Sequence, residues 1–74
     1  MEKVLNETII TKDNEGTYYT FKGILYYNKG QYDEAINYYM KALKIRETKL
    51  GMDHPLTTQT NKNLNLCKQK MLLK

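Results

Sequence analysis

The 74-residue sequence has little with which to build covalent or metal cross-links. Cys67 is the only cysteine, so no internal disulfide can form. Cys67 and His54 together are two possible zinc ligands, fewer than the number in a zinc site, which is about four. We therefore interpret Cys67 as a packing residue and expect neither a metal nor a cofactor. A chain of this length buries only about 60% of the surface that it exposes when unfolded, which predicts a thin core.

Long apolar runs are also missing. No stretch approaches the roughly 18 apolar residues of a membrane-spanning helix, and residues 1–10 lack both a basic start and a long apolar run. These absences predict a protein without a membrane span in a reducing compartment, and we expect the cytoplasm.

Few residues offer catalytic chemistry. The four glycines stand singly, so the sequence has no glycine-rich loop for phosphate. Asp53 and His54 are neighbours, but no serine, further acid or activated cysteine has the spacing to complete a catalytic group with them. Helix capping beside Pro55 is the simpler interpretation of this pair, and we predict that the chain is not an enzyme.

Positive charge is concentrated in the second half of the chain. Residues 1–40 hold four lysines and six acidic residues, a net charge of −2, whereas residues 41–74 hold eight basic and two acidic residues, a net charge of +6. This distribution suits an acidic partner or nucleic acid, and seven tyrosines offer rings on which bases stack. Nucleic acid is the less favoured partner, because four of these tyrosines have helix-packing spacings and most charge runs are solvated helix faces.

The first helical pattern covers residues 17–28. Tyr19, Gly23 and Tyr26 recur at spacings of four and three, so they share one face of a helix. Gly30 ends this helix, since glycine adopts the left-handed backbone conformation without a Cβ clash.

A second helix is predicted from about Asp33 to Leu50, where Gly51 ends it. Asp33 and Glu34 lie in its first turn, where negative side chains complement the helix dipole. One wide, mainly apolar stripe follows it. The stripe consists of Ala35, Ile36, Tyr39, Ala42, Leu43 and Arg46.

A loop of about three residues joins these two helices, which makes them antiparallel neighbours. We expect Gly23 to face Ala35 and to let the two backbones approach closely. A third helix is predicted to begin at Pro55, whose missing N–H costs nothing at the first helical position. Its buried face is expected to comprise Leu56, Thr60, Leu64, Cys67 and Met71.

The run from Gly23 to Ile36 closely resembles the tetratricopeptide repeat, in which spaced aromatic and small residues lock two helices together. The residues that carry the resemblance are Tyr19, Gly23, Tyr26, Gly30, Tyr32, Ala35, Tyr39 and Ala42. Lys22 departs from the pattern, because the family has a large aliphatic residue there. Either this side of the first helix faces solvent, or Phe21 replaces the missing packing.

The segment from Leu50 to Pro55 looks like the linker of the kinesin light chain type of repeat, which reads Leu-Gly-x-Asp-His-Pro. Asn65, aligned with the small residue of the next repeat, lies 42 positions after Gly23. This period exceeds the about 34 residues of the ordinary repeat and agrees with that subtype.

The resemblance implies an all-α fold, an antiparallel helical hairpin plus a third helix, as in a fragment of an α-α superhelix. Residues 1–16 form a linker or the stub of a preceding helix in this interpretation. Residues 17–50 form the complete hairpin, and residues 51–74 form a linker with the first helix of a next repeat or a capping helix.

The family implies a concave surface, lined by successive first helices, that accepts a peptide or part of a partner protein. The implied lining residues are Thr17, Thr20, Ile24, Tyr27, Asn28, Gln59, Lys62, Asn63, Leu66 and Lys70. Asn63 is the sharpest candidate, because the family's asparagine at this position often bonds a peptide backbone. The matching position in the first helix is Phe21, so a two-helix carboxylate clamp is not expected.

Two functions remain open. The first is an interaction scaffold that binds a protein or peptide, with an adaptor role like that of kinesin light chains. The second is a structural or self-associating element that stacks through its exposed hairpin ends on further repeats or on another copy. Repeats usually need about three neighbours, so we expect marginal stability for the chain alone.

Overall fold

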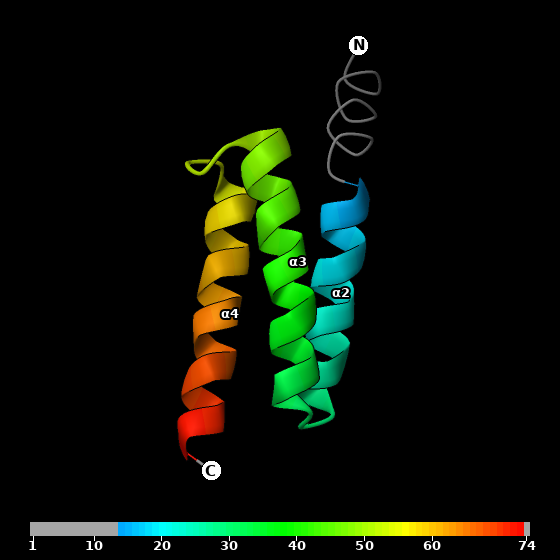
Figure 1. Cartoon of the computed structure of the whole chain (residues 1–74), viewed down its shortest axis with the longest axis vertical. Coiled ribbons are helices and arrows are strands. Elements are labelled where there is room, and N and C mark those ends of the chain that lie inside the picture. Colours follow the sequence, from blue (N-terminus) through cyan, green and yellow to red (C-terminus); the bar gives the residue numbers. More distant parts are fainter. Residues whose placement is uncertain (1–13, 74) are drawn as a thin grey trace.

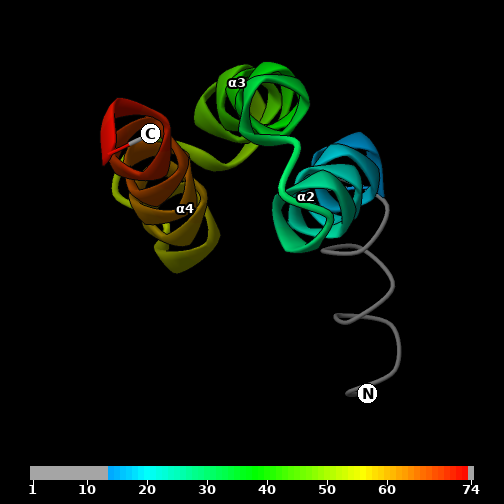
Figure 2. The same cartoon turned by 90° about the horizontal axis from the view of Figure 1, so that it is seen from below.

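The computed structural model describes residues 14–73, which form three consecutive α-helices (Figure 1). Helix α2 spans Asn14–Asn28, α3 spans Tyr32–Leu50 and α4 spans Pro55–Leu73. Each helix runs antiparallel to the next, and α3 packs against both of the others. Seen end-on in Figure 2, the helices form an arch with α3 at its top and α2 and α4 as its two sides. The predicted all-α fold, a hairpin plus a third helix, is confirmed.

Glycines end α2 and α3 at the predicted places. Gly30 has φ 81° and Gly51 has φ 95°, both in the left-handed region that favours glycine. A Cβ at either position would meet nothing within 4 Å, so backbone conformation and not crowding requires glycine here. The Gly51 N–H donates to the carbonyls of Arg46 and Glu47 at 3.1 and 3.2 Å, which satisfies the last turn of α3.

Helix α2 begins three residues earlier than the sequence predicts. Asn14, Glu15 and Gly16 are helical and belong to α2, so the predicted start of the hairpin at Thr17 is three residues too late. Glu15 lies in the first turn, where its charge complements the helix dipole, and Gly16 is buried inside the helix. The rest of the predicted linker or helix stub, residues 1–13, lies outside the described residues.

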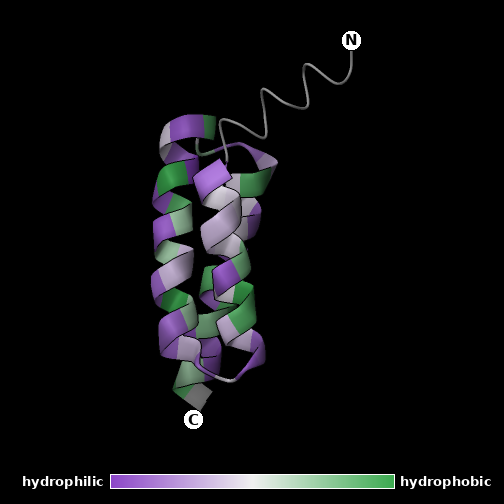
Figure 3. Cartoon of the chain, turned by 90° about the vertical axis from the view of Figure 1, so that its right-hand side faces the viewer, coloured by the Kyte–Doolittle hydropathy of each residue, from purple (hydrophilic) through white to green (hydrophobic). Residues whose placement is uncertain are grey.

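The core runs along α3. Its fully buried apolar side chains come from α3 and α4, and partly buried side chains surround them. They are Ala35, Tyr39, Ala42, Leu64 and Cys67, with Tyr26, Tyr27, Ile36 and Leu43 packed around this cluster. Hydrophobic and hydrophilic residues alternate in bands along each helix (Figure 3), as expected for amphipathic helices that each bury one stripe. The stripe predicted for α3 is therefore confirmed.

Gly23 allows the close approach of α2 and α3, but its neighbour differs from the prediction. A Cβ at Gly23 would lie 2.7 Å from Cδ1 and Cε1 of Tyr39, so the Tyr39 ring lies against this glycine. The expectation that Gly23 faces Ala35 is corrected accordingly. The large Tyr39 ring fits only against a residue without a side chain. The small side chain of Ala35 would not require a glycine opposite it.

The buried face of α4 differs from the prediction at its two ends. Met71 is 43% exposed, because it borders an open hollow beside the turn between α2 and α3. Thr57 is buried instead, and its hydroxyl has no hydrogen-bond partner among the described residues. On α2, Phe21 is 65% exposed, so within residues 14–73 it does not replace the packing that the family's aliphatic residue would give at Lys22.

Candidate functional site

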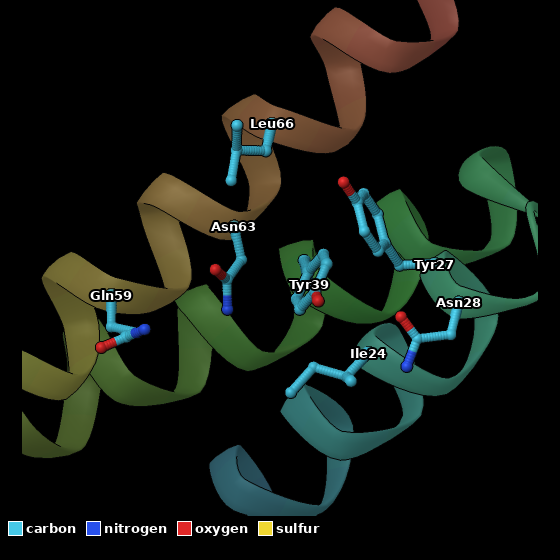
Figure 4. A pocket seen from close by; sticks show the side chains of 7 residues that line it. All are labelled: Ile24, Tyr27, Asn28, Tyr39, Gln59, Asn63 and Leu66. Atoms are coloured by element: carbon cyan, nitrogen blue, oxygen red, sulfur yellow. The ribbon is translucent and has the colours of Figure 1, made fainter.

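A hollow of about 310 Å³ lies between α2 and α4, with α3 beneath it (Figure 4). Its volume is near the lower end of the about 300–1,000 Å³ of ligand pockets. We call it the groove. It is lined by Ile24, Tyr27 and Asn28 of α2, Tyr39 of α3, and Gln59, Asn63 and Leu66 of α4.

The sequence predicted ten lining residues, and the structure brings six of them together around the groove. The other four are Thr17, Thr20, Lys62 and Lys70. Thr20 is buried, and its hydroxyl donates to the Gly16 carbonyl at 2.7 Å, so it is used inside α2. Thr17 accepts a hydrogen bond from Arg46, while Lys62 and Lys70 are exposed outside the groove.

Tyr39 is the lining residue that the sequence interpretation missed. It was assigned to packing alone, and it does pack: only 3% of it is exposed, and its ring lies against Gly23. In Figure 4 the same ring lies between the side chains of α2 and α4, at the floor of the groove. The signal that indicates this second role is the hydroxyl itself, since a buried tyrosine usually finds a partner for its O–H.

The environment keeps the Tyr39 hydroxyl protonated. Burial, and then the neighbouring Cys67 and Tyr27, raise the pKa of Tyr39 to about 12. No hydrogen bond from this hydroxyl is found within residues 14–73, where only the Thr57 hydroxyl is both buried and unpartnered, so the Tyr39 hydroxyl opens to the groove. The floor of the groove therefore presents a neutral O–H donor.

The two walls of the groove combine apolar and amide side chains. Ile24 and Leu66 are 36% and 49% exposed and line opposite walls of the groove. Asn28, Gln59 and Asn63 add carboxamides, each of which donates and accepts hydrogen bonds. None of the lining residues carries a charge. Such a surface suits an uncharged stretch of polypeptide, whose backbone needs both donors and acceptors.

Arg46 links the three helices beside the groove. It is 4% exposed, and its Nη1 donates to the Leu56 carbonyl at 3.2 Å and to Thr60 Oγ1 at 2.8 Å. Its Nη2 donates to Thr17 Oγ1 at 3.4 Å. One side chain of α3 thus holds residues of α2 and α4, which are the two walls of the groove. The planar guanidinium suits this role, because it presents several donors in a fixed geometry.

Three other tyrosines, Tyr19, Tyr26 and Tyr38, build a different surface along α2 and α3. Tyr38 stacks between Tyr19 and Tyr26, at centroid distances of 6.1 and 5.3 Å. The Lys41 ammonium lies 5.6 Å from the Tyr19 centroid and 5.8 Å from the Tyr38 centroid. These rings use their faces on one another and on lysine, which makes them a weak platform for nucleic acid bases.

Two other kinds of site are absent from the part of the chain that the structure describes. Between residues 14 and 73, no three His, Cys, Asp or Glu side chains gather where a metal ion would bind. None of the three described helices has the length and apolar character needed to cross a membrane.

Comparison with known families identifies one match. The family model described as Tetratricopeptide repeat matches residues 17–56, more than half of the chain. This range contains most of α2, all of α3 and the start of α4. No curated protein and no solved structure matches the chain.

Proposed function

The chain belongs to the tetratricopeptide repeat family, and from this premise we propose that it binds a segment of a partner protein in the groove between α2 and α4. Proteins of this family generally mediate protein–protein interactions, and the repeat is a non-catalytic scaffold. The proposed function is therefore that of an interaction module without catalytic activity of its own.

The observation that carries this proposal is the convergence of three helices on one open groove. Asn28 and Ile24 come from one wall, Asn63 and Leu66 from the other, and Tyr39 from the floor. A mostly apolar hollow with a few directed polar groups is the usual composition of a binding site. Its open side admits a chain segment, which a closed cavity would not.

We also propose the kinesin light chain type for this repeat, with an adaptor role in the cytoplasm. The linker after Leu50 supports the subtype. Gly51 ends α3 with φ 95°, His54 Nδ1 accepts the Leu56 N–H at 3.1 Å, and Pro55 is the first residue of α4. Gly51, His54 and Pro55 thus each have a local role in turning the chain from one repeat to the next.

A peptide-binding measurement tests the main proposal. Peptides selected on the 74-residue chain from a displayed library of random sequences would be titrated against Asn63→Ala and the control Lys62→Ala. We expect at least about fivefold weaker binding for Asn63→Ala, from the loss of one hydrogen bond, and no change for Lys62→Ala. Equal binding by all three proteins, or loss of the fold in Asn63→Ala, would contradict a role of Asn63 in binding.

Self-association is the second candidate, and a separate surface favours it. Tyr18, Phe21 and Leu25 recur at spacings of three and four on α2, and they are 55%, 65% and 45% exposed. An exposed apolar stripe of this kind is typical of a surface that another helix covers. Sedimentation over a range of concentrations separates the candidates, because a concentration-independent monomer excludes this one.

A further inference from the structure

We propose that the Tyr39 hydroxyl determines specificity in the groove, by donating a hydrogen bond to the amide side chain of an asparagine or glutamine that the bound segment inserts between aliphatic residues. This inference rests on the proposed function, since it names the chemistry of the segment that the groove accepts. The hydroxyl oxygen of Tyr39 has no role in the packing of the repeat.

The first argument is the state of the hydroxyl in the described chain. Tyr39 is 97% buried, counted from its 3% exposure, and yet lines the groove. The Gly23 contact involves the ring carbons Cγ, Cδ1 and Cε1 of Tyr39, so phenylalanine would pack equally well there. Within residues 14–73 only the Thr57 hydroxyl is both buried and without a partner, so the Tyr39 hydroxyl opens to the groove. A ligand that covers it must accept its hydrogen bond or leave the donor unsatisfied.

Depth decides which part of a bound segment meets Tyr39. Ile24 and Leu66 are 36% and 49% exposed and form the edge of the groove, whereas Tyr39 is almost fully buried beneath them. A peptide backbone therefore lies along the edge, where Ile24 and Leu66 contact aliphatic side chains of the segment. What reaches the floor is a single side chain.

The charge of the groove decides which side chain this is. No lining residue is charged, so a carboxylate or ammonium group would lose its hydration without gaining a counter-charge. An aliphatic side chain would leave the Tyr39 hydroxyl unsatisfied. An amide accepts from Tyr39 through its oxygen and donates through its NH₂ group to the side-chain oxygen of Asn63 or Asn28. An amide thus satisfies the floor and the walls together through two separate atoms, whereas a hydroxyl side chain has one oxygen for both.

The test uses the full 74-residue chain and a displayed library of random dodecapeptides. The library is selected on the wild-type chain, and the enriched sequences are expected to share an asparagine or glutamine with aliphatic neighbours. One such peptide and its analogue with leucine in place of the amide residue are then titrated against wild type and Tyr39→Phe. Tyr26→Phe is the matched control, because it removes the same atom from a ring outside the groove.

We expect the Tyr39→Phe substitution to weaken binding of the amide peptide by about five- to tenfold. The leucine analogue should bind wild type and Tyr39→Phe with equal affinity. Tyr26→Phe should bind the amide peptide as wild type does. Thermal melts of all three proteins are compared, so that a lost fold is not taken for a lost contact.

Four results would overturn the inference, and only the last of them would also overturn the proposed function. Selected peptides with a charged residue at the central position, or equal affinity of Tyr39→Phe and wild type for the amide peptide, reject the role of Tyr39 alone. Equal losses for Tyr39→Phe with both peptides reject it as well, because the hydroxyl would then not recognise the amide. Failure to select any peptide that binds the folded chain rejects the proposed function and this inference together.

Discussion

Nη1 of Arg46 lies 2.8 Å from Oγ1 of Thr60, and this contact joins the middle helix to α4 inside the core. The same guanidinium reaches Thr17 on α2 through Nη2, so both walls of the groove are held by one buried side chain. Buried charged groups are retained only when hydrogen bonds replace their hydration, and Arg46 meets this condition with partners from each neighbouring helix. The geometry of the groove consequently depends on a polar contact that lies among buried threonines and apolar side chains.

Replacing Arg46 should destabilise the fold more than any exposed change on α3. Arg46→Ala removes hydrogen bonds from a charged donor, each worth about 1.5–3 kcal/mol, and leaves Thr60 without that partner. We expect a loss of about 3 kcal/mol in the free energy of unfolding, measured by urea denaturation. Lys44→Ala on the exposed side of α3 is the control, with an expected change below about 0.5 kcal/mol. An Arg46→Lys variant as stable as wild type would show that the forked guanidinium is not needed.

Gly23→Ala should be destabilising because of the Tyr39 ring. The new Cβ would lie 2.7 Å from two ring carbons, a distance that forces the ring or the helix to move. Overpacking of this kind costs about 1–3 kcal/mol, which exceeds the gain in helix propensity from glycine to alanine. The urea midpoint of Gly23→Ala, compared with that of Gly23→Ala in a Tyr39→Leu background, measures the clash. If the second substitution does not relieve part of the loss, Tyr39 is not its source.

The sequence predicted the elements that local signals determine. Gly30 and Gly51 marked helix ends because a positive φ selects glycine, and Pro55 marked a helix start because it has no N–H to lose. Gly16 gives no such signal, because it is buried within α2 although glycine is a poor helix former. Its burial depends on tertiary packing, which no local pattern reports.

The candidate site was predicted as far as helix faces determine it. Six of ten expected residues line the groove because successive first helices share one orientation, and Tyr39 was missed because a packing position was not expected to reach a surface as well. Arg46 was placed on the buried stripe, but its partners lie 10, 14 and 29 positions away in the sequence. Contacts over such separations depend on the angles between helices, which spacing does not fix.

High pH should weaken the fold through Tyr39. Its folded pKa is raised to about 12 from the ordinary 10.0, chiefly by burial, so the unfolded chain releases this proton first. The sign follows: the contribution is fully present below about pH 10 and is lost as pH rises toward 12, with a total on the order of 2 kcal/mol. Burial also raises the pKa of the Cys67 thiol above 9.0, which adds a loss in the same direction.

Urea denaturation at several pH values between about 8 and 11 measures this dependence. The matched variant is Tyr39→Phe, which keeps the ring and removes the titrating group. Its free energy of unfolding should fall less steeply above about pH 10 than that of wild type. Parallel curves for the two proteins would show that the alkaline loss arises from other groups.

His54 should contribute to the free energy of unfolding as a cap of helix α4, although it lies in a loop. Its Nδ1 accepts the Leu56 N–H at 3.1 Å and its carbonyl accepts the Thr58 N–H at 3.0 Å, so both ends of the residue satisfy the first turn of α4. His54→Ala should lower the free energy of unfolding by about 1 kcal/mol, as for other lost caps, whereas His54→Asn should restore most of it because asparagine caps well. Urea denaturation followed by circular dichroism measures both variants, with Asp53→Ala as the neighbouring control. If alanine and asparagine prove equally stable at this position, Nδ1 contributes nothing as a cap, and the turn at Gly51 with Pro55 alone determines where α4 begins.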